Sequence, residues 1–433
     1  MSKIIFPILK NLARRVLKKY HPRVVGITGS IGKTTTKGVI AGVLSKKFRV
    51  RASEKNYNNE VGVPLTILGV EAPGKSPLAW LRVLGTFGRL MLRRDPDFPE
   101  ILVLEMGADK PGDLSYLMEI TRPEVAVVTA IAPAHLEFFK TMENIAKEKA
   151  TLVKAVPPSG LVILNGDDAL VAAMGENSSA RATSFGFNDQ AEIKALSYEC
   201  DYPENGPRGE QWGINFKIEY QGRVMPMFLP YALARHQVYG ALAAVAVGNF
   251  FEMNLVDIAE ALKTLKPTPG RLNLIAGVKQ TLLVDDTYNS SPEACLASLE
   301  AAVSLATEGQ RWAVLGDMLE LGKIAEDAHA LVLDKAIDLG YTQIVGVGPL
   351  FAKAIGKLAG QGISAGISAG AKLYTFAESG AAADFMRQEV AIGDLVLIKG
   401  SQGMRMERVV KNLMMQPQRA DKLLVRQYGK WLE

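Results

Sequence analysis

Short apolar runs alternate with amphipathic stretches along most of the chain. Runs rich in Val, Ile and Leu are typical of strands buried on both faces, and the stretches between them show the 3.6-residue period of helices. This alternation predicts parallel sheets covered by helices, an α/β fold. The predicted strands are one that begins at residue 24 and others at 48–52, 101–104, 124–132, 161–168, 281–286, 312–317, 343–347 and 394–399.

Two features interrupt this alternation. From about residue 182 to 230 the pattern changes to short alternating strands, with turns at Asn205-Gly206 and Gln221-Gly222, which predicts a small antiparallel lobe. A Pro-rich stretch, KPTPGR at 266–271, marks the predicted domain boundary. Because 433 residues are too many for one core, we expect three segments. Their bounds are 1–23, 24–266 and 267–433.

Residues 3–20 and 75–94 have a different composition, since both are amphipathic and basic. The segments 1–23 and 75–94 hold seven and five Lys and Arg residues and no acid, so the rest of the chain is net acidic. Each helix can pack on the neighbouring domain or rest on an anionic membrane surface. The pattern alone leaves both interpretations open.

The overall composition is that of an ordinary globular protein, with 48% hydrophobic and 22% charged residues. The two cysteines, Cys200 and Cys295, have no metal-ligand spacing, and no run of eighteen apolar residues occurs. We therefore expect a cytoplasmic protein with reduced cysteines, without a spanning helix or a cleaved signal peptide. We expect no nucleic-acid partner.

Residues 24–39, VVGITGSIGKTTTKGV, indicate a nucleotide triphosphate site. A buried strand leads into a glycine-rich turn and a helix, the order in which backbone N–H groups can surround phosphate oxygens. Lys33 supplies a cation, and Thr34 or Thr35 supplies a hydroxyl for Mg²⁺. The turn residues are Gly29, Ser30 and Gly32, a shorter spacing than that of the general P-loop. The alternative is a helix N-terminus with chance glycines.

Polar residues follow two other predicted strands. Glu105 ends the strand at 101–104, where a ligand for Mg²⁺ is needed beside a phosphate loop, and His135 follows the strand at 124–132. His135 can also be a structural histidine. The turn that contains Asn58 and Asn59 would, by itself, be only a turn, and nothing local distinguishes Lys149 from a solvent-exposed lysine.

Several strings together resemble one family, the ATP-dependent Mur ligases, and most closely its D-alanyl-D-alanine-adding branch. They occur in order from about residue 24 to 410. The strings are TGSIGKTTTK, NYNNEVGVPLT, LEMGADKPGDL, PAHLEFFKTMENIAKEK, PGRLN, DDTYNSSPEA, LGDMLELG and LIKGSQGMRME. The resemblance implies a P-loop parallel-sheet central domain and a Rossmann-like α/β C-terminal domain.

The resemblance also implies a reaction. ATP phosphorylates a carboxylate of a muramyl tripeptide, and the amine of D-alanyl-D-alanine attacks the acyl phosphate to give an amide, ADP and phosphate. Cations must separate the two anions that react, so ATP and Mg²⁺ are the implied cofactors. Two alternatives stay open: a ligase of the same mechanism that acts on another acid, such as a lipid-linked one, and a non-catalytic nucleotide-binding relative.

Individual roles follow from the same resemblance. Lys33 would bind the β- and γ-phosphates, and Lys149 would be carbamylated and so become a carboxylate ligand of Mg²⁺. Closure of the C-terminal domain would complete the site and exclude water. Thr34 and Glu105 would bind one Mg²⁺ and His135 a second, and Asn58 and Asn59 would bind the substrate, with Asn59 helping to orient the phosphate. Arg271 would contact ATP, Asn289 the adenine and Asp317 the ribose.

The chain departs from the family pattern in places that concern the substrates. Only about twenty-three residues precede the first predicted strand, so we expect the family's N-terminal UDP-sugar-binding domain to be missing. Gln402-Gly403 stands where the family has an Arg-Ser pair, Lys55-Asn56 replaces Gly-Asn, and His236-Gln237 replaces His-Asn, with Gly240 in place of a second asparagine. The ATP-binding residues are intact, whereas substrate identity is left open.

Overall fold

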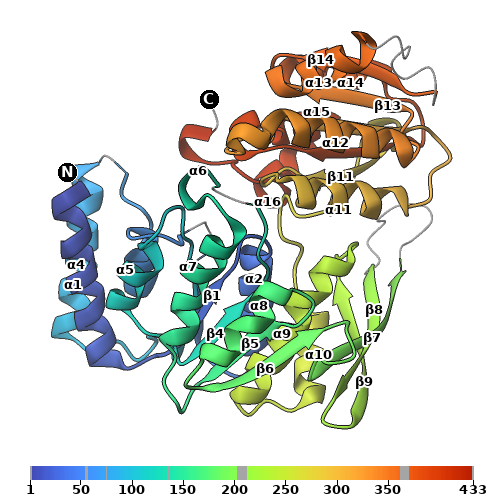
Figure 1. Ribbon diagram of the computed structural model, residues 1–433. Helices are drawn as coiled ribbons and strands as arrows, with labels where there is room; N and C mark the ends of the chain where they lie inside the picture. Colours follow the sequence, from blue (N-terminus) through green and yellow to red (C-terminus); the bar gives the residue numbers. More distant parts are fainter. Residues whose placement is uncertain are drawn as a thin grey trace. The chain divides into compact units, whose positions relative to one another are not determined.

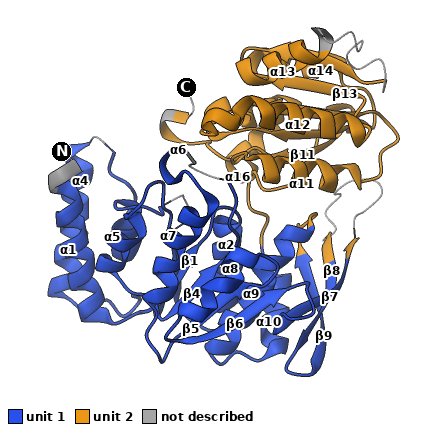
Figure 2. Cartoon of the chain, viewed as in Figure 1, with its two compact units in different colours: residues 1–198, 215–229, 235–265 blue, residues 199–214, 230–234, 266–433 orange. Residues whose placement is uncertain are grey.

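The computed structural model describes residues 2–53, 57–74, 76–133, 136–201, 212–360 and 370–431. The chain divides into two compact units, shown in Figure 2. Unit 1 comprises residues 1–198, 215–229 and 235–265, and unit 2 comprises residues 199–214, 230–234 and 266–433. Residues 1–23, predicted as a segment of their own, belong to unit 1.

Unit 1 is built on a sheet with the strand order β2-β3-β1-β4-β5-β6-β7-β8-β9 (Figure 1). The pairings from β2 to β7 are parallel, and β1, β3, β4 and β5 are buried almost throughout. This confirms a parallel sheet covered on both faces. The strands are β1 (Arg23–Thr28), β2 (Val50–Ala52), β3 (Ile101–Glu105), β4 (Val125–Val128), β5 (Leu161–Asn165), β6 (Arg181–Gly186), β7 (Ile193–Asp201), β8 (Gly213–Tyr220) and β9 (Arg223–Pro230).

The predicted antiparallel lobe is the far end of this sheet and not a separate layer. Strands β8 and β9 are joined through Gln221 and Gly222, whose φ values of 52° and 71° are those that a tight hairpin turn requires. The other predicted turn, at Asn205-Gly206, lies outside the described residues. The strand predicted at 124–132 is shorter than expected, because its last four residues form a loop.

Helices flank the sheet of unit 1 on both sides. They are α1 (Ser2–Tyr20), α2 (Lys33–Leu44), α3 (Gly62–Leu68), α4 (Pro77–Leu92), α5 (Asp113–Ile120), α6 (Leu136–Phe139), α7 (Met142–Lys154), α8 (Ala169–Ala172), α9 (Arg235–Phe250) and α10 (Leu255–Lys263). The N-terminal helix α1 packs on this domain, since Leu9, Ala13 and Val16 are buried in its core. No helix in the described part of the chain combines the length and apolar character needed to cross a bilayer.

Unit 2 contains a six-stranded sheet with the order β10-β11-β15-β12-β13-β14. Four of its strands, β11, β12, β13 and β15, were predicted, and they pair in parallel. The two edge strands were not predicted: β10 pairs antiparallel with β11, and β14 pairs parallel with β13. The strands are β10 (Asn273–Ala276), β11 (Leu282–Asp286), β12 (Arg311–Gly316), β13 (Gln343–Val347), β14 (Lys372–Phe376) and β15 (Leu395–Lys399). The helices are α11 (Pro292–Val303), α12 (Ala325–Asp338), α13 (Pro349–Gly360), α14 (Ser379–Glu389), α15 (Glu407–Leu413) and α16 (Ala420–Leu423).

Helix α1 is an integral part of unit 1, and adjacent substitutions test this. We expect Leu9→Ala to lower the free energy of unfolding by about 2–4 kcal/mol, because it leaves a cavity in the core. Ile8→Ala, on the half-exposed neighbour, should cost less than about 1 kcal/mol. Urea unfolding of the two variants measures the difference, and equal costs would mean that α1 is not part of the folded core.

Candidate active site

The phosphate loop predicted between β1 and α2 is present. Hydrogen bonds join it to the residues that directly follow β4. Gly29 has φ 145° and Gly32 φ 82°, and a Cβ on Gly29 would lie 2.0 Å from Thr129 Oγ1, so glycine is required there. Thr129 Oγ1 donates to the carbonyl of Ile31 over 2.6 Å, and Ser30 N donates to the carbonyl of Ala130 over 2.7 Å. The loop is therefore held in a defined shape.

The charge and the polar atoms of this loop suit an anion. Lys33 Nζ donates to the loop carbonyls of Gly29 and Ser30 over 2.6 and 2.8 Å, which holds an ammonium group beside the turn. Ser30 Oγ is one of the few buried side-chain atoms in the described residues that have no hydrogen-bond partner. A hydroxyl and an ammonium at a helix N-terminus match the oxygens of a phosphate group.

Glu105 is the centre of a buried polar cluster beside the loop. Its carboxylate accepts hydrogen bonds from Thr34 Oγ1 at 3.1 and 3.3 Å and from Asn58 Nδ2 at 3.2 Å. Lys37 Nζ lies 3.3 Å from Glu105 Oε2, and both side chains are almost fully buried. The structure thus brings together Thr34, Asn58 and Glu105, which the sequence singled out, and adds Lys37.

Lys37 is a site residue that the sequence analysis missed. It lies three residues after Thr34 and four after Lys33 on α2, and so faces the same side of the helix. That spacing was the available signal, but it is also the spacing of an ordinary exposed face. Only the fold shows that this face meets the end of β3.

The two asparagines have different positions. Asn59 is exposed, and its Oδ1 accepts hydrogen bonds from Val61 N and Gly62 N at the start of α3. The Asn58 carbonyl accepts Gly107 N over 2.8 Å, while its side chain reaches Glu105. In this structure it is therefore the side chain of Asn58 that contacts Glu105, a predicted metal ligand, while that of Asn59 bonds to the start of α3.

Thr34 and Glu105 fit a Mg²⁺ ion. Hydroxyl and carboxylate oxygens are the hard ligands that Mg²⁺ prefers, and the ion often takes one or two carboxylates together with phosphate oxygens. In the described residues no group of three or more His, Cys, Asp and Glu side chains could hold a metal by itself. His135, the predicted ligand of a second ion, lies outside the described residues.

Lys149 is buried on α7, with only 3% of its surface exposed. Burial, and to a lesser extent the nearby charge of Lys33, lowers the pKa of its amine to about 7, against the opposite effect of Glu148, Asp109 and Asp113. The neutral and the protonated amine are therefore about equally populated near pH 7. This is not the solvent-exposed lysine that its sequence context indicates.

Unit 2 carries the other predicted nucleotide contacts, of which Asn289 lies on the loop after β11 and Arg271 just before β10. Asp285 organises this loop by accepting hydrogen bonds from Gly270 N and from the backbone and hydroxyl of Thr287, and burial raises the pKa of its carboxyl to about 6. Tyr288 N in turn donates to the carbonyl of Gly270. The guanidinium of Arg271 lies 4.1 Å from the Tyr288 ring centre, and Arg271 Nε is buried without a hydrogen-bond partner.

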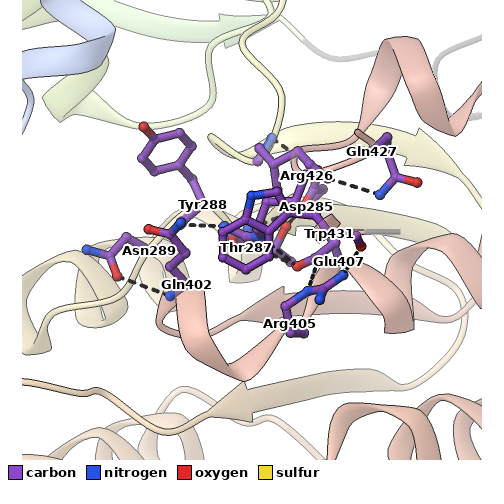
Figure 3. Close-up of polar contacts among 12 residues, drawn as sticks. Asp285, Thr287, Tyr288, Asn289, Gln402, Arg405, Glu407, Arg426, Gln427 and Trp431 are labelled. Atoms are coloured by element: carbon purple, nitrogen blue, oxygen red, sulfur yellow. Dashed lines mark hydrogen bonds and ion pairs between the residues drawn. The ribbon is translucent and has the colours of Figure 1, made fainter. Parts of the chain in front are cut away.

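The C-terminal part of the chain also makes hydrogen bonds to the loop after β11. Arg426 donates to the carbonyls of Thr287 and Tyr288 and pairs with the buried carboxylate of Glu407 over 2.8 Å (Figure 3). The exposed Asn289 extends beyond these contacts, and its Oδ1 accepts Gln402 N over 3.4 Å. The loop backbone is thus fixed while the Asn289 side chain reaches solvent.

Asp317 occupies a different setting from the one predicted. Its carboxylate is buried and accepts hydrogen bonds from Leu350 N and Phe351 N, at the first turn of α13, over 3.0 and 2.9 Å. His329 Nε2 lies 3.8 Å away. These contacts give Asp317 a structural role in unit 2, and a ribose contact stays a prediction.

Comparisons with known proteins decide the family. The model of the Mur ligase middle domain matches residues 27–77 and 87–248, and that of the Mur ligase glutamate ligase domain matches residues 270–402. The UDP-N-acetylmuramoyl-tripeptide--D-alanyl-D-alanine ligase of Bacillus subtilis is 30% identical over 420 residues, which is 94% of this chain and 79% of that protein. The chain belongs to the Mur ligase family.

Other relatives agree with this assignment. The ligase of the same name from Mycobacterium leprae is 32% identical over 405 residues, which is 87% of this Mur ligase and 71% of that protein. The crystal structure of MurF from Thermotoga maritima in complex with ADP superposes with a TM-score of 0.72 at 28% identity, covering 94% of this chain and 83% of that one. A MurF structure from Acinetobacter baumannii gives 0.73 at 26% identity, covering 94% and 79%.

The pair of Lys37 and Glu105 provides a test of the cluster. We expect Lys37→Met to lower the free energy of unfolding by about 3–5 kcal/mol, because it leaves the Glu105 carboxylate buried without its counter-charge. Adding Glu105→Gln should restore much of the loss, and Lys154→Met, on an exposed lysine, should cost less than about 0.5 kcal/mol. Urea unfolding measures all three; a double variant no more stable than Lys37→Met would contradict the pairing.

Proposed function

We propose that this Mur ligase is an ATP-dependent amide-forming ligase of peptidoglycan precursor synthesis, acting in the cytoplasm. It would join D-alanyl-D-alanine to the carboxylate of a muramyl tripeptide, the reaction named by the relatives above. The observation that carries the proposal is the phosphate loop directly beside the Thr34, Lys37, Asn58 and Glu105 cluster. Such a cluster can place cations between two reacting anions.

The residues of unit 1 would share the work as follows. The loop at 29–32 and Lys33 bind and orient the triphosphate, while Thr34 and Glu105 hold Mg²⁺. The ion, when bound, reduces the electrostatic repulsion between the substrate carboxylate and the γ-phosphate. Lys37 holds Glu105 in place and Asn58 fixes the turn beside it. The carboxylate then attacks the γ-phosphate, and the amine displaces phosphate from the acyl phosphate.

From unit 2 we propose that Arg271 and Asn289 contact the bound nucleotide. The proposal is supported by Arg271 Nε, which has no hydrogen-bond partner among the described residues, and by the exposed side chain of Asn289, whose Oδ1 accepts the long hydrogen bond from Gln402 N. We propose that the boundary between the central domain and the C-terminal domain lies at residues 266–267. We also propose peripheral contact with a membrane through residues 3–20 and 75–94.

Phosphate release with defined substrates tests the activity. We expect turnover with D-alanyl-D-alanine and a muramyl tripeptide, and Lys33→Ala should reduce it by about 100-fold or more, because the loop loses its cation. Lys46→Ala, on an exposed lysine just after α2, should retain full activity. Undiminished turnover in Lys33→Ala would contradict the nucleotide site, and turnover only with another acid and amine would replace the proposed substrates.

Lys149 predicts a pH dependence. Its neutral amine can attack CO₂, forming an N–C bond and releasing one proton, which yields the carbamate that we propose as a Mg²⁺ ligand. Because the pKa of Lys149 is lowered to about 7, the amine is protonated as pH falls below about 7, so carbamate and activity should both decline there. The carbamate carbon is measured by ¹³C NMR with labelled CO₂, alongside kcat from pH 6 to 8.

Paired variants control this measurement. Lys149→Gln should lose the carbamate signal and most of the activity at every pH, since an amide cannot bind CO₂. Lys147→Gln, on the exposed face of the same helix, should keep both. A carbamate signal that persists in Lys149→Gln would assign the modification to another residue.

A further inference from the structure

Helix α4 has two apolar faces, of which the core covers one. Val83 and Leu90 are buried in the core of unit 1. Away from the core, Leu78, Leu81, Leu84 and Leu92 are 74%, 62%, 49% and 92% exposed, with Leu84 on the flank of the helix. These are leucines at helical spacing on the outside of the molecule, which is unusual for a helix of a globular domain. The family model of the middle domain does not match residues 78–86, where three of these leucines lie.

Basic side chains surround the leucines. Arg82, Arg89, Arg93 and Arg94 are exposed on or just after α4, and neither α4 nor α1 contains an acidic residue. Arg89 pairs with Asp95 over 2.9 Å, which leaves three arginines of this group without an ion pair among the described residues. The surface therefore combines exposed apolar groups with an excess of positive charge.

Helix α1 lies beside α4 (Figure 1) and adds mainly charge, since Ile8 is the exposed large apolar side chain among its described residues. Lys19 Nζ donates to the carbonyls of Leu90 and Met91, and Tyr20 Oη donates to that of Leu90, so the C-terminal ends of the two helices are joined. The apolar stripe of α1 is buried in the core. Arg14, Arg15 and Lys18 line a hollow of about 480 Å³ beside α5, together with Asn11, Leu17 and Ile120.

We propose that α4 docks this ligase on an anionic membrane surface, with its leucines in the acyl-chain boundary and the arginines of α4 and the basic face of α1 at the lipid headgroups. Leucine and arginine side chains side by side match the layered chemistry of a bilayer surface, apolar below and anionic above. A second copy of the chain is a poor occupant, because a two-fold interface through this face would oppose arginine with arginine.

This inference deepens the membrane contact that is part of the proposed function, and rests on it. The pattern of residues predicts the same role for residues 3–20 and 75–94, whereas the structure distinguishes them: α4 exposes four leucines, while most of the apolar stripe of α1 is buried in the core. Ligase turnover measured without lipid tests the proposed reaction independently of membrane docking. The proposed reaction and the proposed docking can therefore fail separately.

Vesicle flotation of the full chain tests the inserted leucines. We expect binding to vesicles of phosphatidylglycerol and phosphatidylethanolamine, and weak or no binding to phosphatidylcholine alone. The triple change Leu78→Gln, Leu81→Gln and Leu92→Gln should weaken binding at least tenfold, and these exposed positions should leave folding and solution turnover unchanged. The matched control is Val256→Gln, Leu331→Gln and Ile392→Gln, which removes exposed apolar side chains elsewhere and should bind as the wild type does.

A second triple variant tests the charge. Arg82→Gln, Arg93→Gln and Arg94→Gln should each contribute roughly a fivefold loss of binding, and the remaining binding should respond less to added salt. The control, Lys217→Gln with Arg223→Gln, removes exposed charge from the β8–β9 hairpin and should have no effect.

Three outcomes would overturn the docking proposal. These are no binding of the wild type to anionic vesicles, equal binding of the leucine variant and its control, and self-association that the leucine variant abolishes without any vesicle binding. The last result would assign the surface to a second copy of the chain. Retained docking with no ligase turnover would overturn the proposed reaction alone.

Discussion

The arrangement of the site in unit 1 depends on one buried ion pair, between Lys37 and Glu105. A carboxylate withdrawn from water at the end of β3 is stable only with a counter-charge and hydrogen-bond donors around it. Lys37 and Thr34 supply these from α2, and Asn58 supplies one from the turn before α3. The pair therefore fixes where helix, strand and turn meet. Because the phosphate loop leads directly into α2, its position relative to Glu105 is fixed as well.

Local chemistry explains the parts of the site that the sequence predicted. A strand, two glycines, Lys33 and Thr34 form a contiguous pattern whose geometry follows from the backbone, and the structure has this loop. Glu105 was predicted from a general property of parallel sheets, in which side chains at the carboxyl ends of the strands gather at one edge. Its contacts with Thr34 confirm that the two residues lie together. The parallel strands at the centre of both sheets were predicted for a similar reason, since buried strands are continuous apolar runs.

Features that depend on tertiary packing could not be read from the pattern. Lys149 looks like a surface lysine, and only its burial distinguishes its amine, so the resemblance alone pointed to it. The edge strand β14 is largely half-exposed and lacks a long apolar run, which explains why it was missed. For α4 the period of the leucines was visible, but periodicity does not say which face the core covers. The hydrogen bonds from Leu350 N and Phe351 N to Asp317 also depend on tertiary packing, and they leave the predicted ribose contact untested.

The contact of Arg426 with the carbonyls of Thr287 and Tyr288 joins positions about 139 residues apart in the chain. Contacts of such long sequence separation form late in folding, because bringing the two distant segments together costs loop-closure entropy. During synthesis, this loop can therefore take its final shape only when nearly the whole polypeptide has left the ribosome. A nascent or C-terminally shortened chain would have a folded unit 1 before the loop after β11 in unit 2 was complete.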